Sequence, residues 1–394
     1  MFNRLIFLPI LLILFSVHLS ALEIRLNGFA TIAAGMTDEK DDVYHHYDDE
    51  LSFSPDSVLG LQLDAELLDK LSGTFQLMAC ENYVDDDFQL EWAYLTYDYS
   101  SDFRLLLGRI RPSMFLYSSY LDVGYAYLWV SPPQEMYSFV PLTNIDGINL
   151  SYNHVIGDYE LSLTGWLGDK KKIRGTKELT FKLNHSYIAG GEIALSHDFA
   201  KFRVSYARAK LTANLKNILL QPNKQLLSIY ENRNTPAEDR YLLGLEKHPE
   251  IQFNDSLGQF LGFGMHADYK NIIFISEYIR RFVKKTAFPD LKSWYTTLAY
   301  RIGDFTPHFT YSSVKTNVAT YTDREDAVLE SVVNNVLQES ANKTQSVTLG
   351  VRYKVNSSAV LKAEWISTNV DIAGSVQPLD GKINTFKLGL SIIF

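Results

Sequence analysis

Residues that can ligate a metal ion gather in one early segment, where two histidines stand among four aspartates. Imidazole and carboxylate groups together could bind a divalent cation. The spacing matches no established metal motif, so a solvated acidic loop is the favoured interpretation. The segment contains Asp41, Asp42, His45, His46, Asp48 and Asp49.

Groups suited to hydrolytic catalysis are dispersed along the chain. His154, His266 and His308 are far apart, and neither a Gly-x-Ser-x-Gly elbow nor a His-Glu-x-x-His zinc pattern occurs. The single cysteine, Cys80, has no histidine beside it and is interpreted as a passive strand residue. We therefore expect no enzyme activity, no catalytic residues, no metal site and no cofactor, with a phospholipase or protease as the alternative.

The elements that hold these side chains have a hydrophobic period of two. In residues 384–394 every second side chain from Phe386 to Phe394 is apolar, and Lys387 lies on the opposite face. The same alternation runs through residues 59–67, 347–355 and 361–365, with full charges on the second face. This pattern predicts long β-strands that separate an apolar face from a polar one.

Applied to the whole chain, the pattern predicts about sixteen strands. Two-residue turns such as Asp69-Lys70 and Gly303-Asp304 alternate strictly with longer connections such as 112–144 and 212–256. The predicted strands are 22–34, 57–69, 71–83, 88–99, 102–111, 145–156, 158–168, 188–199, 201–211, 257–269, 271–284, 293–303, 305–316, 345–356, 358–369 and 384–394. In 271–284, residues 272–275 are apolar on both faces, which indicates a subunit contact or a different register.

Composition and the N-terminus limit the class of protein. The net charge of −9 favours no nucleic-acid partner. Residues 1–21 contain Arg4, an apolar run and the small pair Ser20-Ala21, so we interpret them as a secretory signal peptide rather than an anchor helix. Beyond residue 21 no apolar run of about 18 residues occurs, which excludes a helical membrane protein. An exported chain with one cysteine must be stabilised by packing and backbone pairing.

Strand length and loop order together predict a transmembrane barrel over residues 22–394. A tilted strand needs about 9 to 11 residues to cross the bilayer, and an open sheet edge in lipid would leave backbone groups unpaired. An all-β, antiparallel up-and-down barrel of about sixteen strands meets both conditions, with short periplasmic turns and long extracellular loops. A secreted β-sandwich or a soluble barrel is the alternative, although sandwich strands are shorter, at roughly 5 to 6 residues.

The exported precursor, the sixteen alternating strands and the terminal Leu388-Gly389-Leu390-Ser391-Ile392-Ile393-Phe394 resemble the Gram-negative general porins. The resemblance implies a water-filled channel in the cell outer membrane for small hydrophilic solutes and ions, surrounded by outer-membrane lipid and lipopolysaccharide. It also implies that Phe394 is a signal for the barrel-assembly machinery. A homotrimer is a further implication, although residues 84–87 are too short for the loop that reaches over the neighbouring subunit in trimeric porins.

In porins the third loop folds into the barrel lumen, and the corresponding connection here is about 112–144. Residues 121–133 are rich in aromatic side chains, which suits a buried loop. The resemblance implies that Arg109 and Arg111 face acidic residues of this loop across the pore constriction. The candidate acidic partners are Asp122 and Glu135, with Asp146 as a further candidate.

Strand alternation places further cations on the polar face, where they would line the pore and set the barrier to ions. Carboxylates such as Glu91, Glu277 and Glu364 share that face, and the first two loops are acidic. Ion selectivity therefore stays open. The predicted pore-lining cations are Arg25, Arg104, Arg203, Arg301, Arg352 and Lys362.

Three other outer-membrane functions are alternatives. A substrate-specific channel would share every feature described above. A plugged transporter of hydrophobic substrates would need an N-terminal plug, but strand-like sequence begins directly after the signal peptide. An adhesin could use the long connection at 216–250, for which a variable surface loop is the simpler interpretation.

Overall fold

The computed structural model describes residues 23–40, 46–80, 88–138, 142–170, 172–174, 180–182, 187–213, 253–283, 290–317, 334, 342–372 and 379–394. Within these ranges, no helix is both long enough and apolar enough to cross a membrane. Four predicted features lie wholly or partly outside the described residues: the signal peptide, the connection at 84–87, the loop at 216–250, and Asp41, Asp42 and His45 of the early acidic segment.

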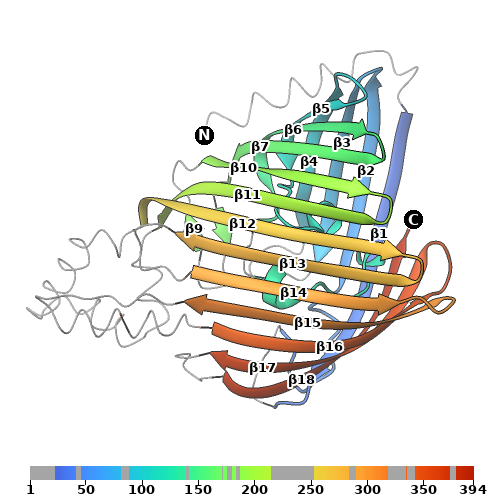
Figure 1. Ribbon diagram of the computed structural model, residues 1–394, viewed down its shortest axis with the longest axis vertical. Helices are drawn as coiled ribbons and strands as arrows, with labels where there is room; N and C mark the ends of the chain where they lie inside the picture. Colours follow the sequence, from blue (N-terminus) through green and yellow to red (C-terminus); the bar gives the residue numbers. More distant parts are fainter. Residues whose placement is uncertain are drawn as a thin grey trace, which may run out of the picture.

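Sixteen strands form one closed barrel in which neighbours pair antiparallel and β1 pairs with β18 (Figure 1). A separate two-stranded sheet, β8 (Lys172–Arg174) with β9 (Thr180–Lys182), lies between β7 and β10 in sequence. The barrel strands are β1 (Glu23–Thr37), β2 (Val58–Leu68), β3 (Leu71–Cys80), β4 (Phe88–Asp98), β5 (Phe103–Ile110), β6 (Ile145–Ile156), β7 (Tyr159–Asp169), β10 (Tyr187–His197), β11 (Ala200–Ala213), β12 (Phe253–Tyr269), β13 (Ile272–Val283), β14 (Asp290–Tyr300), β15 (Phe305–Asn317), β16 (Asn342–Lys354), β17 (Ala359–Ile372) and β18 (Leu379–Ile393).

The predicted fold class is confirmed: the chain is an all-β, closed, sixteen-stranded antiparallel barrel. Most strand ends agree with the predicted ranges to within a few residues. The largest differences are at the long connections, where β12 begins at Phe253 and β18 at Leu379. Backbone pairing there continues past the last alternating side chain, and a sequence pattern cannot detect this. The three-residue strands β8 and β9 are too short to show a period.

Alternation of side chains separates an outer from an inner face along the barrel strands, with a bulge at Glu91 of β4. On β18, Leu388 is 61% exposed on the outer face, whereas its neighbour Lys387 is 3% exposed on the inner face. In β13, Ile273 and Ile275 face inward and belong to the buried core, while Ile272 lies outside at 48% exposure. The apolar run at 272–275 therefore reflects an apolar patch on the inner wall, and the register of β13 is regular.

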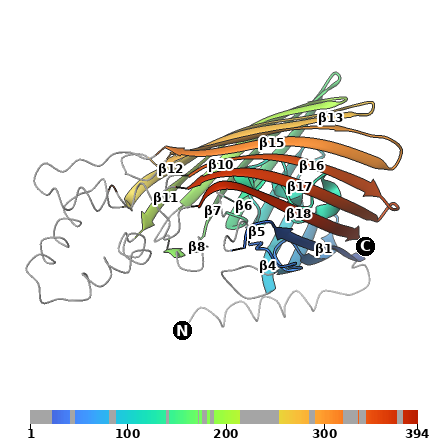
Figure 2. The ribbon, with the colours of Figure 1, turned by 90° about the horizontal axis from the view of Figure 1, so that it is seen from below.

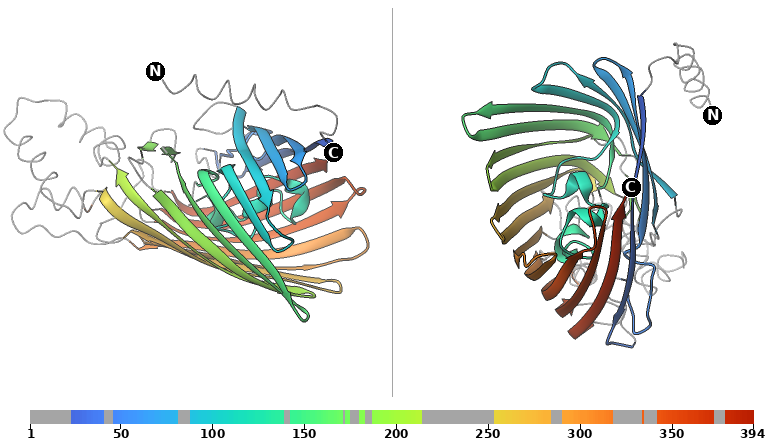
Figure 3. Two further views of the ribbon diagram at one scale, coloured as in Figure 1. Left: turned by 90° about the horizontal axis from the view of Figure 1, so that it is seen from above. Right: turned by 90° about the vertical axis from the view of Figure 1, so that its right-hand side faces the viewer.

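The core of this barrel is in its interior. The third connection, residues 111–144, joins β5 to β6, and its described residues 111–138 and 142–144 lie within the ring of strands (Figure 3). It contains the short helices η1 (Ser118–Tyr120), η2 (Gly124–Ala126) and α2 (Gln134–Tyr137). Its side chains Phe115 and Trp129 form one buried cluster with wall residues such as Ile279 and Tyr295. The strands near β16–β18 flank the same region when the barrel is viewed from below (Figure 2).

Candidate channel and the connection that crosses it

Inward-facing cations of the wall donate hydrogen bonds to backbone carbonyls of the third connection. Three of the predicted pore-lining residues act in this way, and two of them, Arg203 and Lys362, are only 5% and 3% exposed. Their charges are satisfied by peptide dipoles and by nearby carboxylates such as Glu192, which pairs with Arg203 at 2.5 Å. These bonds run from Arg203 to the Ser113 oxygen, from Lys362 to the Gly124 and Trp129 oxygens, and from Arg352 to the Tyr125 oxygen.

Inward-facing carboxylates accept the complementary bonds from backbone N–H groups of the same connection. Glu277 Oε1 accepts from Leu116 N at 2.6 Å, and its second oxygen accepts from the Tyr137 and Tyr295 hydroxyls. Glu364 Oε1 accepts from Val130 N at 3.0 Å. Buried carboxylates are stabilised by such N–H and O–H donors. The charged residues of this part of the wall therefore hold the third connection in place.

Arg111 forms a buried ionic cluster with two carboxylates. Its Nη2 lies 2.6 Å from both Glu91 Oε1 and Asp122 Oδ2, and its side chain is only 5% exposed. Burial acts to lower the pKa of Arg111, but the two carboxylates outweigh it and raise that pKa above its ordinary value. Burial raises the pKa of Asp122 despite the arginine. The structure thus brings together one predicted pair of the constriction, with Arg111 and Glu91 buried and the Asp122 side chain 23% exposed.

Arg109 lies on the outer face of the barrel, where it pairs with Asp146 at 2.7 Å. The adjacent pair in register, Ile110 and Ile145, is buried at 1% in the interior, so Arg109 and Asp146 point the other way. Asp146 shares its face with Ile148, which is 42% exposed. Residues two apart share a face within a strand. Arg111 is separated from Arg109 because β5 ends at Ile110 and the chain then turns inward as the third connection.

Glu135 lies against the opposite wall, on helix α2. Its carboxylate accepts hydrogen bonds from Ser312 Oγ at 2.8 Å and from Ser346 Oγ, while its backbone oxygen accepts from Ser293 Oγ at 2.8 Å. The contacts of Glu135 are therefore with β14, β15 and β16 rather than with either arginine. The four candidate constriction residues do not form one group among the described contacts.

The remaining predicted pore-lining cations lie near the short-turn end and pair with neighbouring carboxylates. Arg25 contacts Glu66 at 3.4 Å, and both side chains are more than half exposed. The other two pairs are Arg104 with Asp98 at 2.6 Å and Arg301 with Asp268 at 2.5 Å. The side chains of these pairs are partly exposed, so their charges are in contact with water. Exposed ion pairs of this kind contribute little to stability.

The interior is asymmetric because the third connection covers only part of the wall. Inward-facing residues of β13–β18 are buried, as shown by Glu277 at 4% exposure and by Thr310 and Thr368 at 0%. On the β1–β5 side, the inward-facing side chains of Arg25 and Arg104 are 59% and 56% exposed. Water therefore reaches the short-turn end of the inner face of β1–β5, whereas deeper inward-facing residues such as Thr31, Gln76 and Glu91 are buried. The end-on view shows the helices of the connection displaced toward one side of the ring (Figure 3).

Part of the first connection, residues 38–57, also enters the barrel, which the sequence pattern did not predict. Asp56 lies 2.7 Å from Lys387 on β18 and accepts a hydrogen bond from the Tyr47 hydroxyl at 3.0 Å. Burial acts to raise the pKa of Asp56, but Lys387 and the hydroxyl donors outweigh it and hold that pKa below 3.8. Lys387 Nζ also contacts Ser131 at 3.1 Å, so one lysine joins the first and third connections.

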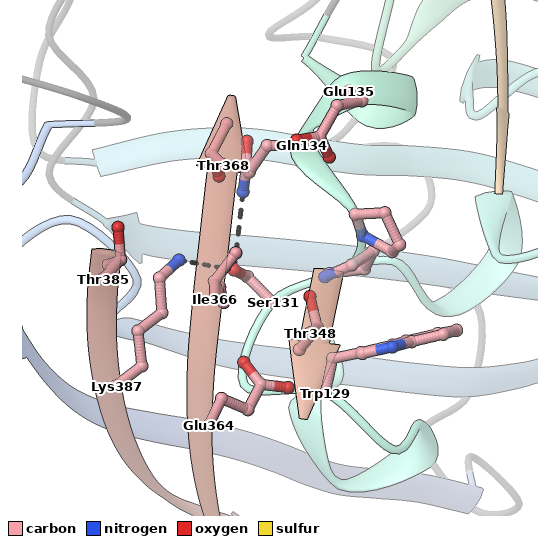
Figure 4. Close-up of a pocket in the computed structure, with 12 residues that line it drawn as sticks. Trp129, Ser131, Gln134, Glu135, Thr348, Glu364, Ile366, Thr368, Thr385 and Lys387 are labelled. Carbon is pink, nitrogen blue, oxygen red and sulfur yellow. Dashed lines mark hydrogen bonds between the residues drawn. The ribbon is translucent and has the colours of Figure 1, made fainter. Parts of the chain in front are cut away.

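A cavity of about 30 Å³ lies between the third connection and β16–β18 (Figure 4). Its polar lining includes Glu364, Lys387 and the hydroxyl of Thr368. A cavity needs roughly 10–15 Å³ to hold one water molecule, so this one is too small for a sugar-sized solute. This cavity is therefore not a route for such a solute.

Within the described ranges, no group of three or more histidine, cysteine, aspartate or glutamate side chains is arranged to hold a metal ion. The early acidic segment is described only from His46 onward, so the metal alternative raised for it is untested. Phe394 continues the seam between β1 and β18, because its N–H donates to Gly28 O at 2.9 Å and Gly28 N donates to Phe394 O at 2.7 Å. Its role as an assembly signal stays a prediction.

Solved structures with the same architecture cover almost the whole chain. The outer-membrane expressed OmpT of Vibrio cholerae aligns with a TM-score of 0.58 at 10% sequence identity, covering 96% of this chain and 99% of that one. Salmonella typhi OmpF, in complex with daunomycin, aligns with a TM-score of 0.56 at 10% identity over 94% and 97% of the two chains. The anion-selective porin from Comamonas acidovorans gives 0.56 at 10% identity over 95% and 100%.

Comparisons with models of protein families and with curated proteins found no match. At 10% identity the structural similarities establish the fold, and they leave the solute and the selectivity open. The closed barrel, the inward-folded third connection and these alignments lead to one conclusion. The chain has the sixteen-stranded outer-membrane β-barrel fold of the Gram-negative porins.

Proposed function

We propose that this protein is an outer-membrane porin that allows passive diffusion of small hydrophilic solutes and ions. The observation that carries the proposal is the half-exposed set of charged side chains on the inner face of β1–β5, represented by Arg25, Glu66 and Arg104. Charged groups on the inside of a closed barrel stay hydrated only where water enters. The solute path opens along this charged part of the inner face, at the short-turn end.

The third connection narrows the channel as a fixed structure. Its carbonyl and N–H groups are held by Lys362, Glu277 and Glu364, and the buried cluster of Arg111 fixes its beginning. The pairs Arg25–Glu66 and Arg104–Asp98 give the open side both signs of charge. This arrangement favours small hydrated solutes over bulky or apolar ones.

The proposal has three further parts. Residues 1–21 act as the export signal. The mature barrel is not an enzyme, and its assembled form is a homotrimer.

A planar bilayer recording tests this function. The purified full chain should form open channels whose reversal potential in a salt gradient reports selectivity, and sugars that enter the path should reduce the current. Arg104→Gln should shift the reversal potential toward cation selectivity at low salt, because it removes one exposed positive charge from the water-filled side. A folded barrel that gives no conductance under any of these conditions would contradict the proposal.

A further inference from the structure

The first connection completes the barrel wall where β1 extends beyond β2. Pairing between these two strands ends at Thr31, whereas β1 continues to Thr37. An open strand edge in a membrane barrel would leave backbone groups unpaired. Residues 48–57 cover this edge through hydrogen bonds from Ala33 N to Ser57 Oγ at 3.0 Å, from Thr37 N to Asp48 O at 2.7 Å, and in both directions between Gly35 and Ser52 at 2.9 Å.

Two side chains of the first connection, Tyr47 and Asp56, point into the interior. Tyr47 is 0% exposed and packs over Gly35 so closely that a Cβ atom there would meet its ring at 2.5 Å. Its hydroxyl donates to Asp56 Oδ2 at 3.0 Å. The same carboxylate oxygen lies 2.7 Å from Lys387 Nζ. Lys387 is only 3% exposed, so this ion pair is buried, and removing one member of a buried pair is strongly destabilising.

Lys387 also holds the third connection. Its Nζ donates to Ser131 Oγ at 3.1 Å. The preceding residue, Val130, donates its N–H to Glu364 Oε1 at 3.0 Å. Val130 also packs over β18, where a Cβ atom at Gly389 would meet its side chain at 3.2 Å. The third connection is therefore fixed here by one carboxylate of β17 and one ammonium group of β18.

The ammonium group of Lys387 has a second carboxylate at the same small cavity. Glu364 and Lys387 both line the cavity of about 30 Å³ between the third connection and β16–β18 (Figure 4). Glu364 Oε2 is buried, and within the described part of the chain it has no hydrogen-bond partner. A side chain with two alternative carboxylates has two discrete arrangements, and such an element is what energetic coupling between two segments requires.

We propose that Lys387 is a positioning residue that couples the first connection to the third. While Asp56 binds the ammonium group, both connections are held on β18. When that pair is broken, the ammonium group turns to Glu364 Oε2, its bond to Ser131 is lost, and both connections loosen together. The inference rests on the proposed function in one step: because the third connection narrows the channel, the first connection then regulates the width of the channel.

Cysteine protection in the purified full chain tests the coupling. In a Cys80→Ser background, Ala33→Cys reports on the first connection and Thr368→Cys on the cavity beside the third, because both native side chains are 0% exposed. Adding Asp56→Asn should raise the rate of labelling by a water-soluble maleimide at least about fivefold at both positions, the lower end of typical coupling between sites. Asp146→Asn is the matched control, because it breaks an ion pair of the outer face and should leave both rates unchanged.

The coupling must also act in the reverse direction, because a coupling free energy belongs to both sites equally. Ser131→Ala changes only the third connection and should raise the labelling rate of Ala33→Cys beside the first. This smaller substitution also decides the question if Asp56→Asn gives no folded barrel. A heat-dependent shift in gel mobility establishes that each variant is folded.

Faster labelling of Ala33→Cys alone in Asp56→Asn would overturn the inference, because the first connection would then move without the third. Unchanged labelling of both reporters would overturn it as well. Ala194→Cys on β10 is a third reporter, since Ala194 is 1% exposed and distant from β18 in the strand order. Faster labelling there would show general loosening of the barrel and would also contradict the coupling.

Bilayer recordings of the same preparations separate this inference from the channel function. Conductance without the labelling contrast would contradict the coupling alone. The labelling contrast in a folded barrel that gives no conductance would contradict the channel function alone.

Discussion

At the scale of single residues, burial decides what each charged side chain does. Arg109 and Arg111 are two positions apart, yet Arg109 is in an outer-face pair and Arg111 in a buried cluster. An exposed pair is worth about 0–1 kcal/mol, whereas removing one member of a buried pair costs about 3–5 kcal/mol. Two arginines that are two positions apart in the sequence therefore have different structural roles.

Substituting these arginines separately tests that difference. Arg111→Met should lower the free energy of unfolding by about 3–5 kcal/mol, because Glu91 and Asp122 are left buried without their cation. Arg109→Met is the matched control and should cost no more than about 1 kcal/mol, with an unchanged reversal potential. Urea unfolding of the detergent-solubilised barrel measures both. Similar losses in the two variants would show that Arg111 has no special structural role.

Asp56 gives the barrel an acid-dependent contribution to stability. Its folded pKa lies below the ordinary value of 3.8, so the folded state stays ionised where the unfolded state takes up a proton. The contribution is complete above the unfolded pKa and is lost as the pH falls through the folded pKa. Asp56→Asn should therefore show a smaller loss of thermal stability between neutral pH and about pH 2 than the native chain. Glu66→Gln, in an exposed pair, is the control and should retain the native pH dependence.

At the scale of elements, the third connection supplies the hydrophobic core that an empty barrel lacks. Trp129 is 1% exposed, donates its indole N–H to Thr310 at 2.9 Å and packs against Tyr295 with ring centroids 5.6 Å apart. Apolar residues of the barrel wall pack against the side chains of the third connection, and charged residues of the wall form hydrogen bonds with its backbone groups. The connection is therefore held by packing and by directed hydrogen bonds together.

Removing the Trp129 side chain should loosen the packing of the third connection. Trp129→Ala should cost about 3–5 kcal/mol, as expected for a large aromatic side chain lost from a core. If the connection narrows the channel, larger sugars should then enter proteoliposomes faster in a swelling assay. Trp294→Ala, which removes the same side chain from the outer face, should leave the swelling rates unchanged. Unchanged rates in Trp129→Ala would place the narrowest point away from this connection.

At the scale of the whole molecule, stability depends on closure between the two ends of the chain. Nine residues of β1 pair with β18, and Phe394 extends the seam through its bonds to Gly28. A Cβ atom at Gly28 would meet the Phe394 ring at 2.4 Å, so a side chain there would displace that ring. The last residue of the chain therefore covers the first strand.

Two substitutions at the seam should reduce assembly in cells. Gly28→Val would displace the Phe394 ring. Phe394→Asp would place a charged group on the outside of the barrel, where the native Phe394 side chain is 61% exposed. Both should lower the fraction of heat-modifiable protein in the outer-membrane fraction. Gly165→Ala is the control, because a Cβ atom there meets open space. Native levels of folded Phe394→Asp would contradict both the assembly signal and the importance of the seam.

The sequence by itself determined the strands and the faces of the barrel. A period of two is a local property, so the alternation from Phe386 to Phe394 and the short turns at Asp69-Lys70 and Gly303-Asp304 predict strands and order without tertiary information. Strict alternation of short and long connections then requires an up-and-down barrel. The same local rule identified Lys362 and Arg203 as inward-facing residues.

Only the tertiary structure decided which inward charges meet water. Lys362 and Arg203 satisfy carbonyls of residues far away in the sequence, while Arg25 and Arg104, which look the same in the sequence, remain exposed. Near the end of β5 the strand pairs Arg109 with Asp146 on the outer face, and only Arg111 turns inward. Burial depends on where a distant segment packs, and alternation within one strand carries no information about that segment.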